Sequence, residues 1–147
     1  MIKLIISREL NKELNDCIPG LGNFIRVKCR TKFKRMRGDY TEPITGLLDT
    51  GAFISLVPYD IWQDMEVDIL TTYEMRGVVP KKECKVNVDV GKIKCRIVDE
   101  FGNKSGEIET YTYLSRTNRV PLIIGFKGLL ERFKIVIDCE KNNAYLD

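Results

Sequence analysis

Residues 47–57 read Leu-Leu-Asp-Thr-Gly-Ala-Phe-Ile-Ser-Leu-Val, and they place one carboxylate, Asp49, between two apolar segments. The leucines before Asp49 predict a buried strand, and Thr50 and Gly51 predict a bend directly after it. A carboxylate held at the end of a buried strand can act as a general acid or base. The Asp-Thr-Gly triplet occurs once in the chain, so a chemistry that needs two such carboxylates requires a second copy of the chain.

The composition limits the classes of protein that this chain can form. Its 147 residues suit a single domain, 1–147, with a main body over 23–147 and residues 1–22 as an optional N-terminal extension. The 24 Lys and Arg residues against 21 Asp and Glu leave a net charge of +3, too small by itself to indicate a nucleic-acid or anionic-membrane partner. Since no segment approaches the ~20 apolar residues of a membrane span, we expect a cytoplasmic protein.

The chain has five cysteines and no histidine. Cys17, Cys29, Cys84, Cys95 and Cys139 are widely spaced and form no Cys-x-x-Cys pair, which favours buried thiols over a disulfide framework. Structural zinc sites draw their ligands in closely spaced pairs, so neither a metal nor another cofactor is expected. The absence of histidine excludes Ser-His and Cys-His catalysis and leaves acid–base chemistry mainly to carboxylates.

Strand patterns dominate the chain and predict one mainly antiparallel β domain. The segment 24–33 alternates strictly between apolar and basic residues, and Gly91 is expected to turn the chain between two alternating segments. Trp62 is expected to pack beside a short helical turn. The expected strands are 2–6, 24–33, 45–49, 86–90, 93–97, 108–114, 120–124, 134–138 and 144–146, and the expected short helices are 8–16 and 58–65.

Residues 120–133 change their hydrophobic period. The apolar run that ends at Ile124 predicts a buried strand, and Gly125 follows it. Phe126, Leu129, Leu130 and Phe133 then stand at i, i+3, i+4 and i+7, which predicts a short amphipathic helix.

From about Phe24 to its end, the chain resembles the retropepsin-like aspartic proteases, the retroviral-type family of small dimeric subunits. Leu-Leu-Asp-Thr-Gly-Ala-x-x-Ser matches the family's catalytic strand, and 73–80 stands where the family has its flap hairpin. Ile123-Ile124-Gly125 matches its hydrophobic-hydrophobic-Gly signature, with the predicted helix after it. The resemblance implies a mainly β, closed antiparallel β-barrel-like fold with one short C-terminal helix.

The resemblance also implies a function, that of a homodimeric aspartic endopeptidase. In such an enzyme one Asp49 from each subunit would activate a water between them, Thr50 would orient the pair, and Gly51 would allow the close approach. The partner would be a peptide or unfolded protein, bound as an added strand beneath the flaps. The implied substrate-binding residues are Ala52, Phe53, Gly77, Val78, Val79 and Ile123.

The chain departs from the family pattern at two linked positions. Retroviral members usually carry an acidic residue where this chain has Phe53 and an arginine where it has Phe126, and these two form an ion pair. Because both partners are replaced together, we expect the two rings to pack against each other instead.

Three other interpretations remain open from the sequence. The chain could be a catalytically weak or inactive dimer that serves as a peptide-binding or interaction module. Its basic residues could contact nucleic acid, although a solvated strand protected from aggregation is favoured, or they could select acidic substrates. These residues are Arg26, Lys28, Arg30, Lys32, Lys34, Arg35 and Arg37.

Overall fold

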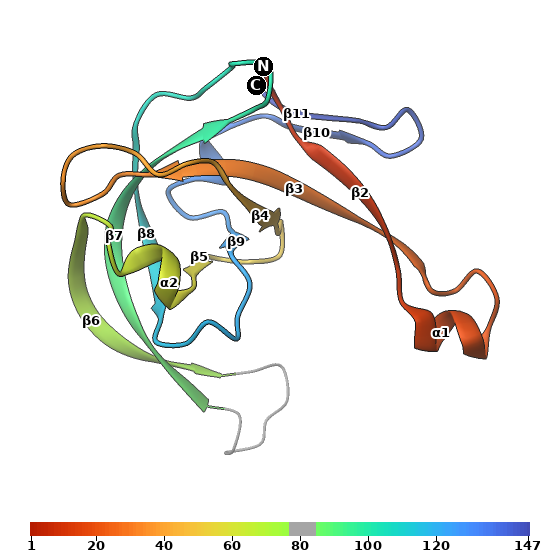
Figure 1. Ribbon diagram of the computed structural model, residues 1–147, viewed down its shortest axis with the longest axis horizontal. Helices are drawn as coiled ribbons and strands as arrows, with labels where there is room; N and C mark the ends of the chain where they lie inside the picture. Colours follow the sequence, from red (N-terminus) through yellow and green to blue (C-terminus); the bar gives the residue numbers. More distant parts are fainter. Residues whose placement is uncertain (77–84) are drawn as a thin grey trace.

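The computed structural model describes residues 1–76 and 85–147, and in these ranges the chain is mainly β and forms two sheets (Figure 1). The larger sheet has eight strands in the order β2-β3-β4-β9-β5-β8-β7-β6, and the smaller has the order β1-β11-β10. The strands are β1 Ile2–Lys3, β2 Ile5–Leu10, β3 Asn23–Phe33, β4 Ile44–Leu48, β5 Ser55–Val57, β6 Val67–Arg76, β7 Lys85–Val98, β8 Ile108–Ser115, β9 Ile123–Ile124, β10 Ile135–Asp138 and β11 Asn143–Leu146. The helices are α1 Lys12–Cys17, α2 Tyr59–Trp62 and the 3₁₀ helix Leu130–Arg132.

The mainly β prediction is therefore confirmed, with two parallel pairings within the mostly antiparallel larger sheet. β4 lies parallel to β9, and β5 lies parallel to β8. β3 pairs with β4 and also with β7, so the pairing leads from β3 around through β9, β5 and β8 and returns to β3. Fully buried side chains from several of these strands, among them Phe33, Ile97 and Leu114, form the core.

The alternation predicted for 24–33 holds in the second half of β3. Cys29, Thr31 and Phe33 are buried, whereas the basic residues between them are partly exposed. In the first half Ile25 is 39% exposed, because this part of β3 lies outside the core. The side chains of β3 are thus more exposed in its first half than in its second half.

Gly91 does not turn the chain, which corrects the prediction made from its sequence context. It lies inside the continuous strand β7, opposite Ile69 of β6 and Thr112 of β8. A Cβ atom at this position would stand 2.8 Å from the Asp68 carbonyl oxygen and 2.9 Å from Leu114 Cδ1. The glycine therefore permits two neighbouring strands to approach β7 closely beside a bulge in β6.

The amphipathic helix expected after Gly125 is absent as an α-helix from the described residues. The chain instead makes turns and the 3₁₀ helix Leu130–Arg132. Gly128 has a φ of +74°, a left-handed conformation that an α-helix cannot contain. The apolar pattern nevertheless predicted burial correctly for Leu129 and Leu130, which are 1% and 0% exposed.

The N-terminal segment divides between the two sheets. The strand expected over 2–6 is interrupted at Leu4, so that β1 pairs with β11 and β2 pairs with β3. The helix expected over 8–16 is shorter, because β2 continues to Leu10 and Asn11 caps α1 by accepting a hydrogen bond from the Leu14 backbone N–H. The β10–β11 hairpin confirms the predicted closing pair of strands.

The second helix and the cysteines agree with the sequence in part. Trp62 ends α2, packs against the core and donates its indole N–H to the Ser115 carbonyl at 2.6 Å. Burial raises the pKa of the Cys29 and Cys95 thiols to about 12, as expected for inert buried thiols. Cys17, however, is exposed on α1, a helix that has no buried residue. In the described ranges we find no helix long and apolar enough to cross a membrane.

Asp99 joins β1 to the loop between β7 and β8. Its carboxylate accepts hydrogen bonds from the backbone N–H groups of Lys3, Phe101 and Asn103, each at 2.9 Å, and from the Asn103 side chain at 2.8 Å. Burial raises the pKa of Asp99, but these hydrogen bonds to the ionised form outweigh it and lower the pKa from 3.8 to about 2.

This lowered pKa predicts an acid-sensitive contribution to stability. Because the folded pKa lies below the unfolded one, the contribution is complete above pH 3.8 and is lost as the pH falls from 3.8 to about 2. We expect Asp99→Asn to lower the free energy of unfolding at neutral pH and to flatten its pH dependence in this window. Urea unfolding at a series of pH values measures both effects, and Asp64→Asn, at an exposed position, should leave the profile unchanged. An unchanged profile in Asp99→Asn would contradict the assignment.

The space around Gly91 predicts a second stability effect. Gly91→Ala should lower the free energy of unfolding by about 1–3 kcal/mol, because the new methyl group overlaps the backbone of β6 and the Leu114 side chain. Gly106→Ala is the matched control, since no atom lies within 4 Å of a Cβ at that position. Chemical unfolding of the two variants measures the difference, and equal stabilities would show that Gly91 is not required by packing.

Candidate functional site

Asp49 stands at the end of β4, where the backbone holds it firmly. Its N–H donates to the Ile124 carbonyl at 3.0 Å, and its own carbonyl accepts from the Ala52 N–H at 3.2 Å. The carboxylate oxygen Oδ1 accepts a hydrogen bond of 2.9 Å from the Gly51 N–H. Asp49, Thr50 and Gly51 are all exposed. The structure thus brings the three predicted catalytic residues together in one bend with an accessible carboxylate.

The strand β9 supports this bend from the adjacent position in the sheet. Leu47 pairs with Ile123 and Leu48 pairs with Ile124 in parallel register, so the two signature segments run side by side. Ile123 also pairs with Leu56 of β5 and is partly exposed. Ile123, one of the predicted substrate-binding residues, therefore lies next to β4, the strand that ends at Asp49.

After β9 the chain crosses the loop 52–55 at close range. The Phe126 and Lys127 N–H groups donate to the carbonyls of Ala52 and Phe53 at 3.0 and 2.8 Å. The buried Ser55 hydroxyl accepts the Gly125 N–H at 2.9 Å. A Cβ atom on Gly125 would stand 2.7 Å from the Ile54 carbonyl carbon, so only glycine fits this crossing without displacing the loop.

The predicted substrate-binding residues Ala52 and Phe53 lie in this crossed loop. Ala52 is partly exposed, whereas the Phe53 side chain is 72% exposed. Phe126 is 36% exposed, so within a single chain the two rings are not buried against each other as the sequence predicted. The loops are joined instead by their backbone hydrogen bonds, and the Phe53 ring remains available to a second molecule or a ligand.

A groove with a volume of about 310 Å³ opens beside Asp49. Three of its apolar residues, Ile25, Val27 and Ile137, were missed by reasoning from the sequence. Their residue types carried no signal, because partners distant in the chain bring β3 and β10 to Asp49. The groove is lined by Ile25, Arg26, Val27, Leu47, Leu48, Asp49, Thr50 and Ile137.

The strands β6 and β7 pair in the region where the flap hairpin 73–80 is expected. Arg76 of β6 pairs with Lys85 of β7, so the hairpin continues beyond the range 73–80. The predicted residues Gly77, Val78 and Val79 lie outside the described residues. Tyr73 of β6 stacks on Tyr113 of β8 with ring centroids 5.8 Å apart. This contact links the hairpin to the strand that precedes the β9 segment.

An ion pair between the buried Asp89 carboxylate and the exposed Arg116 side chain joins β7 of this hairpin to the residues after β8. Arg116, just after β8, donates from Nη2 to Asp89 Oδ1 at 2.8 Å and from Nε to Oδ2 at 3.3 Å. The Thr72 hydroxyl of β6 donates to the same carboxylate at 3.1 Å. The hydrogen bonds from Arg116 hold the pKa of Asp89 below its ordinary value. This contact could not be predicted from the sequence, because Thr72, Asp89 and Arg116 come from separate elements.

The basic face of β3 is largely compensated by nearby carboxylates. Glu9 lies 3.3 Å from Arg26 and 3.7 Å from Lys28, and Glu107 lies 3.4 Å from Lys34. Glu100 pairs with Arg30, and Asp39 pairs with Arg35 and Arg37. These residues therefore form a surface of mixed charge and not an uncompensated basic stripe.

Comparison with known proteins found similarity to solved structures only. No family model and no curated protein matches the chain. Among solved structures, it is similar to a retropepsin-like aspartic protease from Rickettsia conorii, with 17% sequence identity and a TM-score of 0.48, over 99% of this chain and 94% of that chain. At this level of similarity, the activity of the present chain has to be argued from its own residues.

The Ser55 contact predicts the cost of disturbing the crossing. Ser55→Ala removes the acceptor of the buried Gly125 N–H and should lower the free energy of unfolding by about 1–3 kcal/mol. Ser7→Ala is a suitable control, because the Ser7 hydroxyl receives only a 3.3 Å hydrogen bond from Lys28 in a partly exposed position. Urea unfolding compares the two variants. A Ser55→Ala variant as stable as Ser7→Ala would show that the hydroxyl does not support the crossing.

Proposed function

We propose that this protein is an aspartic endopeptidase whose active unit is a twofold homodimer with one Asp49 from each copy. The observation that carries the proposal is the exposed Asp49 carboxylate at the end of β4, held by Gly51 and supported by the Ile-Ile-Gly segment in parallel register. The ring of strand pairings through β3, β4, β9, β5, β8 and β7 is compatible with the closed β-barrel-like retropepsin fold. The signature residues and their contacts support the proposal from the chain itself.

The single carboxylate explains why a second copy is needed. In a twofold contact the same surface meets itself, so Asp49 of one copy can approach Asp49 of the other. Two carboxylates about 3 Å apart cannot both ionise readily, and the pair shares one proton, a behaviour for which aspartic proteases are the standard example. The exposed position of Asp49 leaves the approach open.

The shared proton gives the two carboxylates different roles. The ionised member takes a proton from a water between them, and the protonated member donates a hydrogen bond to the scissile carbonyl. Attack of the water on the carbonyl carbon gives a tetrahedral intermediate with no acyl-enzyme. Thr50 would orient the pair across the interface, and the peptide would lie extended along the groove lined by Leu47 and Ile25.

Asp49→Asn tests the chemical step. It should reduce cleavage of a peptide library or unfolded protein by roughly a hundredfold to ten-thousandfold across acidic to neutral pH, because the pair loses its base. Asp64→Asn, also exposed, should cleave at the wild-type rate. Undiminished cleavage by Asp49→Asn would rule out the mechanism.

A mixing experiment separates a shared site from a site within one chain. An excess of Asp49→Asn protein added to the wild type should lower the activity as mixed dimers form, since each mixed dimer holds only one ionisable Asp49. Activity that stays constant in this titration would contradict the shared site. Absence of cleavage by a dimeric wild type that still binds peptides would favour the alternative, a peptide-binding or interaction module.

A further inference from the structure

The N-terminal residues 5–27 form a projecting arm. It consists of β2, α1 and the first part of β3, with α1 at its far end (Figure 1). β2 pairs with β3 from Lys28 to Asn23, whereas the pairing of β3 with β4 begins only at Lys28. Among the described residues, the section of β3 from Asn23 to Val27 therefore has β2 as its only neighbouring strand.

The arm exposes apolar side chains along its whole length. Leu10, Leu14, Ile18, Leu21 and Ile25 are 57%, 47%, 58%, 53% and 39% exposed. None of the residues of the six-residue helix α1 is buried. A two-stranded hairpin and a helix this short are both marginally stable in water without a surface to pack on. Ile6 and Val27 at the base of the arm pack against the core, whereas its outer part, 10–25, contributes no described side chain to the hydrophobic core.

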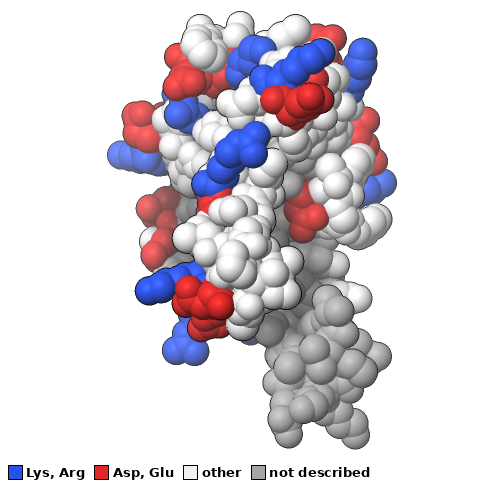
Figure 2. All heavy atoms as spheres, turned by 90° about the vertical axis from the view of Figure 1, so that its right-hand side faces the viewer, with Lys and Arg blue, Asp and Glu red and all other residues white. Residues whose placement is uncertain are grey.

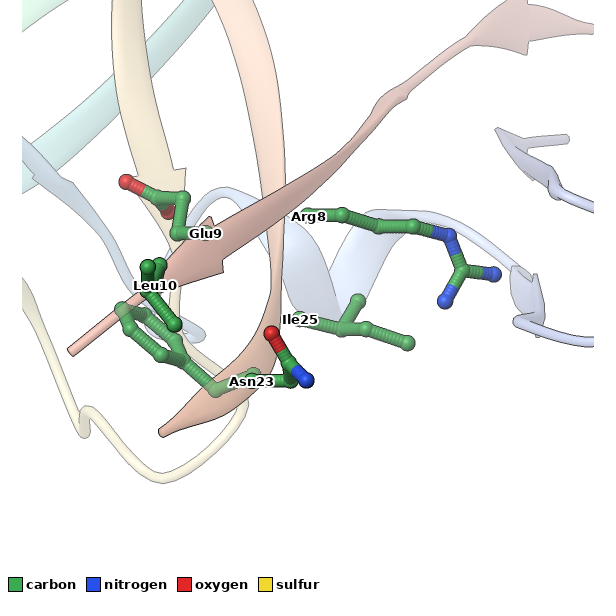
Figure 3. A pocket seen from close by; sticks show the side chains of 6 residues that line it. Arg8, Glu9, Leu10, Asn23 and Ile25 are labelled. Carbon is green, nitrogen blue, oxygen red and sulfur yellow. The ribbon is translucent and has the colours of Figure 1, made fainter. Parts of the chain in front are cut away.

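A groove of about 440 Å³ lies on the arm between β2 and β3. Its charged residues already have partners, because Arg8 donates to the Cys139 carbonyl at 3.0 Å and Glu9 pairs with Arg26. Figure 3 shows the Arg8 side chain pointing away from Leu10. The surface left for another molecule is therefore mainly apolar, formed by residues such as Leu10 and Phe24.

This apolar surface continues to Asp49. Ile25 lines both the groove of the arm and the groove beside Asp49, and Ile137, 41% exposed, lies in the second groove. Figure 2, viewed from the side on which the arm projects, shows an area without Lys, Arg, Asp or Glu residues near the middle of this face. A molecule that binds beside Asp49 from this side therefore also contacts the arm.

We infer that the arm docks on a second copy of this chain and supplies a large part of the twofold interface that brings the two Asp49 residues together. That the arm binds a second copy, and not another protein, rests on the proposed function, which requires a second Asp49 at the site. The apolar surface of the arm is continuous with that site through Ile25. A twofold contact uses each patch twice, so both arms engage their partners and the apolar surfaces of both are buried by the same event. No charged partner is needed, because the ion pairs of the arm are internal to each chain.

Charge substitutions on the arm test the inference. The double variant Leu10→Glu/Ile18→Glu and the single variant Leu14→Glu should each raise the dissociation constant of the dimer by about tenfold or more, because a carboxylate would be buried without a partner. Met36→Glu is the matched control: Met36 is 69% exposed and lies beyond the opposite end of β3. Sedimentation equilibrium measures the constants. Arm variants that dimerise as tightly as Met36→Glu would overturn the inference, as would a monomeric wild type.

Two further measurements exclude misfolding and separate this inference from the proposed function. Hydrogen exchange of wild-type amides in 5–27 should slow as protein concentration rises through the dissociation constant, and exchange independent of concentration in a dimeric sample would overturn the inference. Asp49→Asn should dimerise as the wild type does. If arm substitutions weaken the dimer but the wild type does not cleave peptides, the proposed protease function is refuted and the docking role of the arm is supported. If the wild type cleaves peptides and arm substitutions leave the dimer unchanged, the docking role is refuted and the protease function is supported.

Discussion

The crossing of two loops at Gly125 is the constraint on which the rest of the site depends. β9 can lie parallel to β4 only if the chain leaves it directly beneath residues 52–55, and a side chain at 125 would overlap the Ile54 backbone. The crossing then supplies hydrogen bonds to loop carbonyls that would otherwise be unpaired, those of Ala52 and Phe53. Asp49 is fixed by the same arrangement, since its N–H donates to Ile124 one residue earlier. The carboxylate is thus exposed and immobilised at once, which is the combination that acid–base catalysis requires.

The parts of this arrangement that depend on local sequence could be predicted. The strand before Asp49, the burial of Leu129 and Leu130, and the closing β10–β11 hairpin all follow from hydrophobic period and from turn residues close in the chain. The parts that depend on distant neighbours could not. Gly91 has the sequence surroundings of a turn residue, and only the positions of Asp68 and Leu114 show that it serves close packing inside a strand.

The residues of the candidate site also include some that the sequence predicts and some that it does not. Asp49, Thr50 and Gly51 carry a sequence motif, and the structure places them in a single bend. Ile25 and Ile137 carry none, because an isolated isoleucine on a strand has the same appearance in a core and in a groove. The Phe53 and Phe126 substitution was visible in the sequence, but its consequence was not. In the structure the two loops are joined by backbone hydrogen bonds, and Phe53 is exposed in the single chain.

β3 connects these features physically. Its first residues belong to the arm, Lys28 to Thr31 pair with β4, and its last residues pair with β7. Lys28 is opposite Leu47, two residues before Asp49, so the arm continues directly into the strand beside β4. Docking of the arm on a second copy would therefore bring that copy close to the strand that ends at Asp49. Because hydrogen bonds within one chain already hold Asp49, association under this proposal would add the second carboxylate without having to reposition the first.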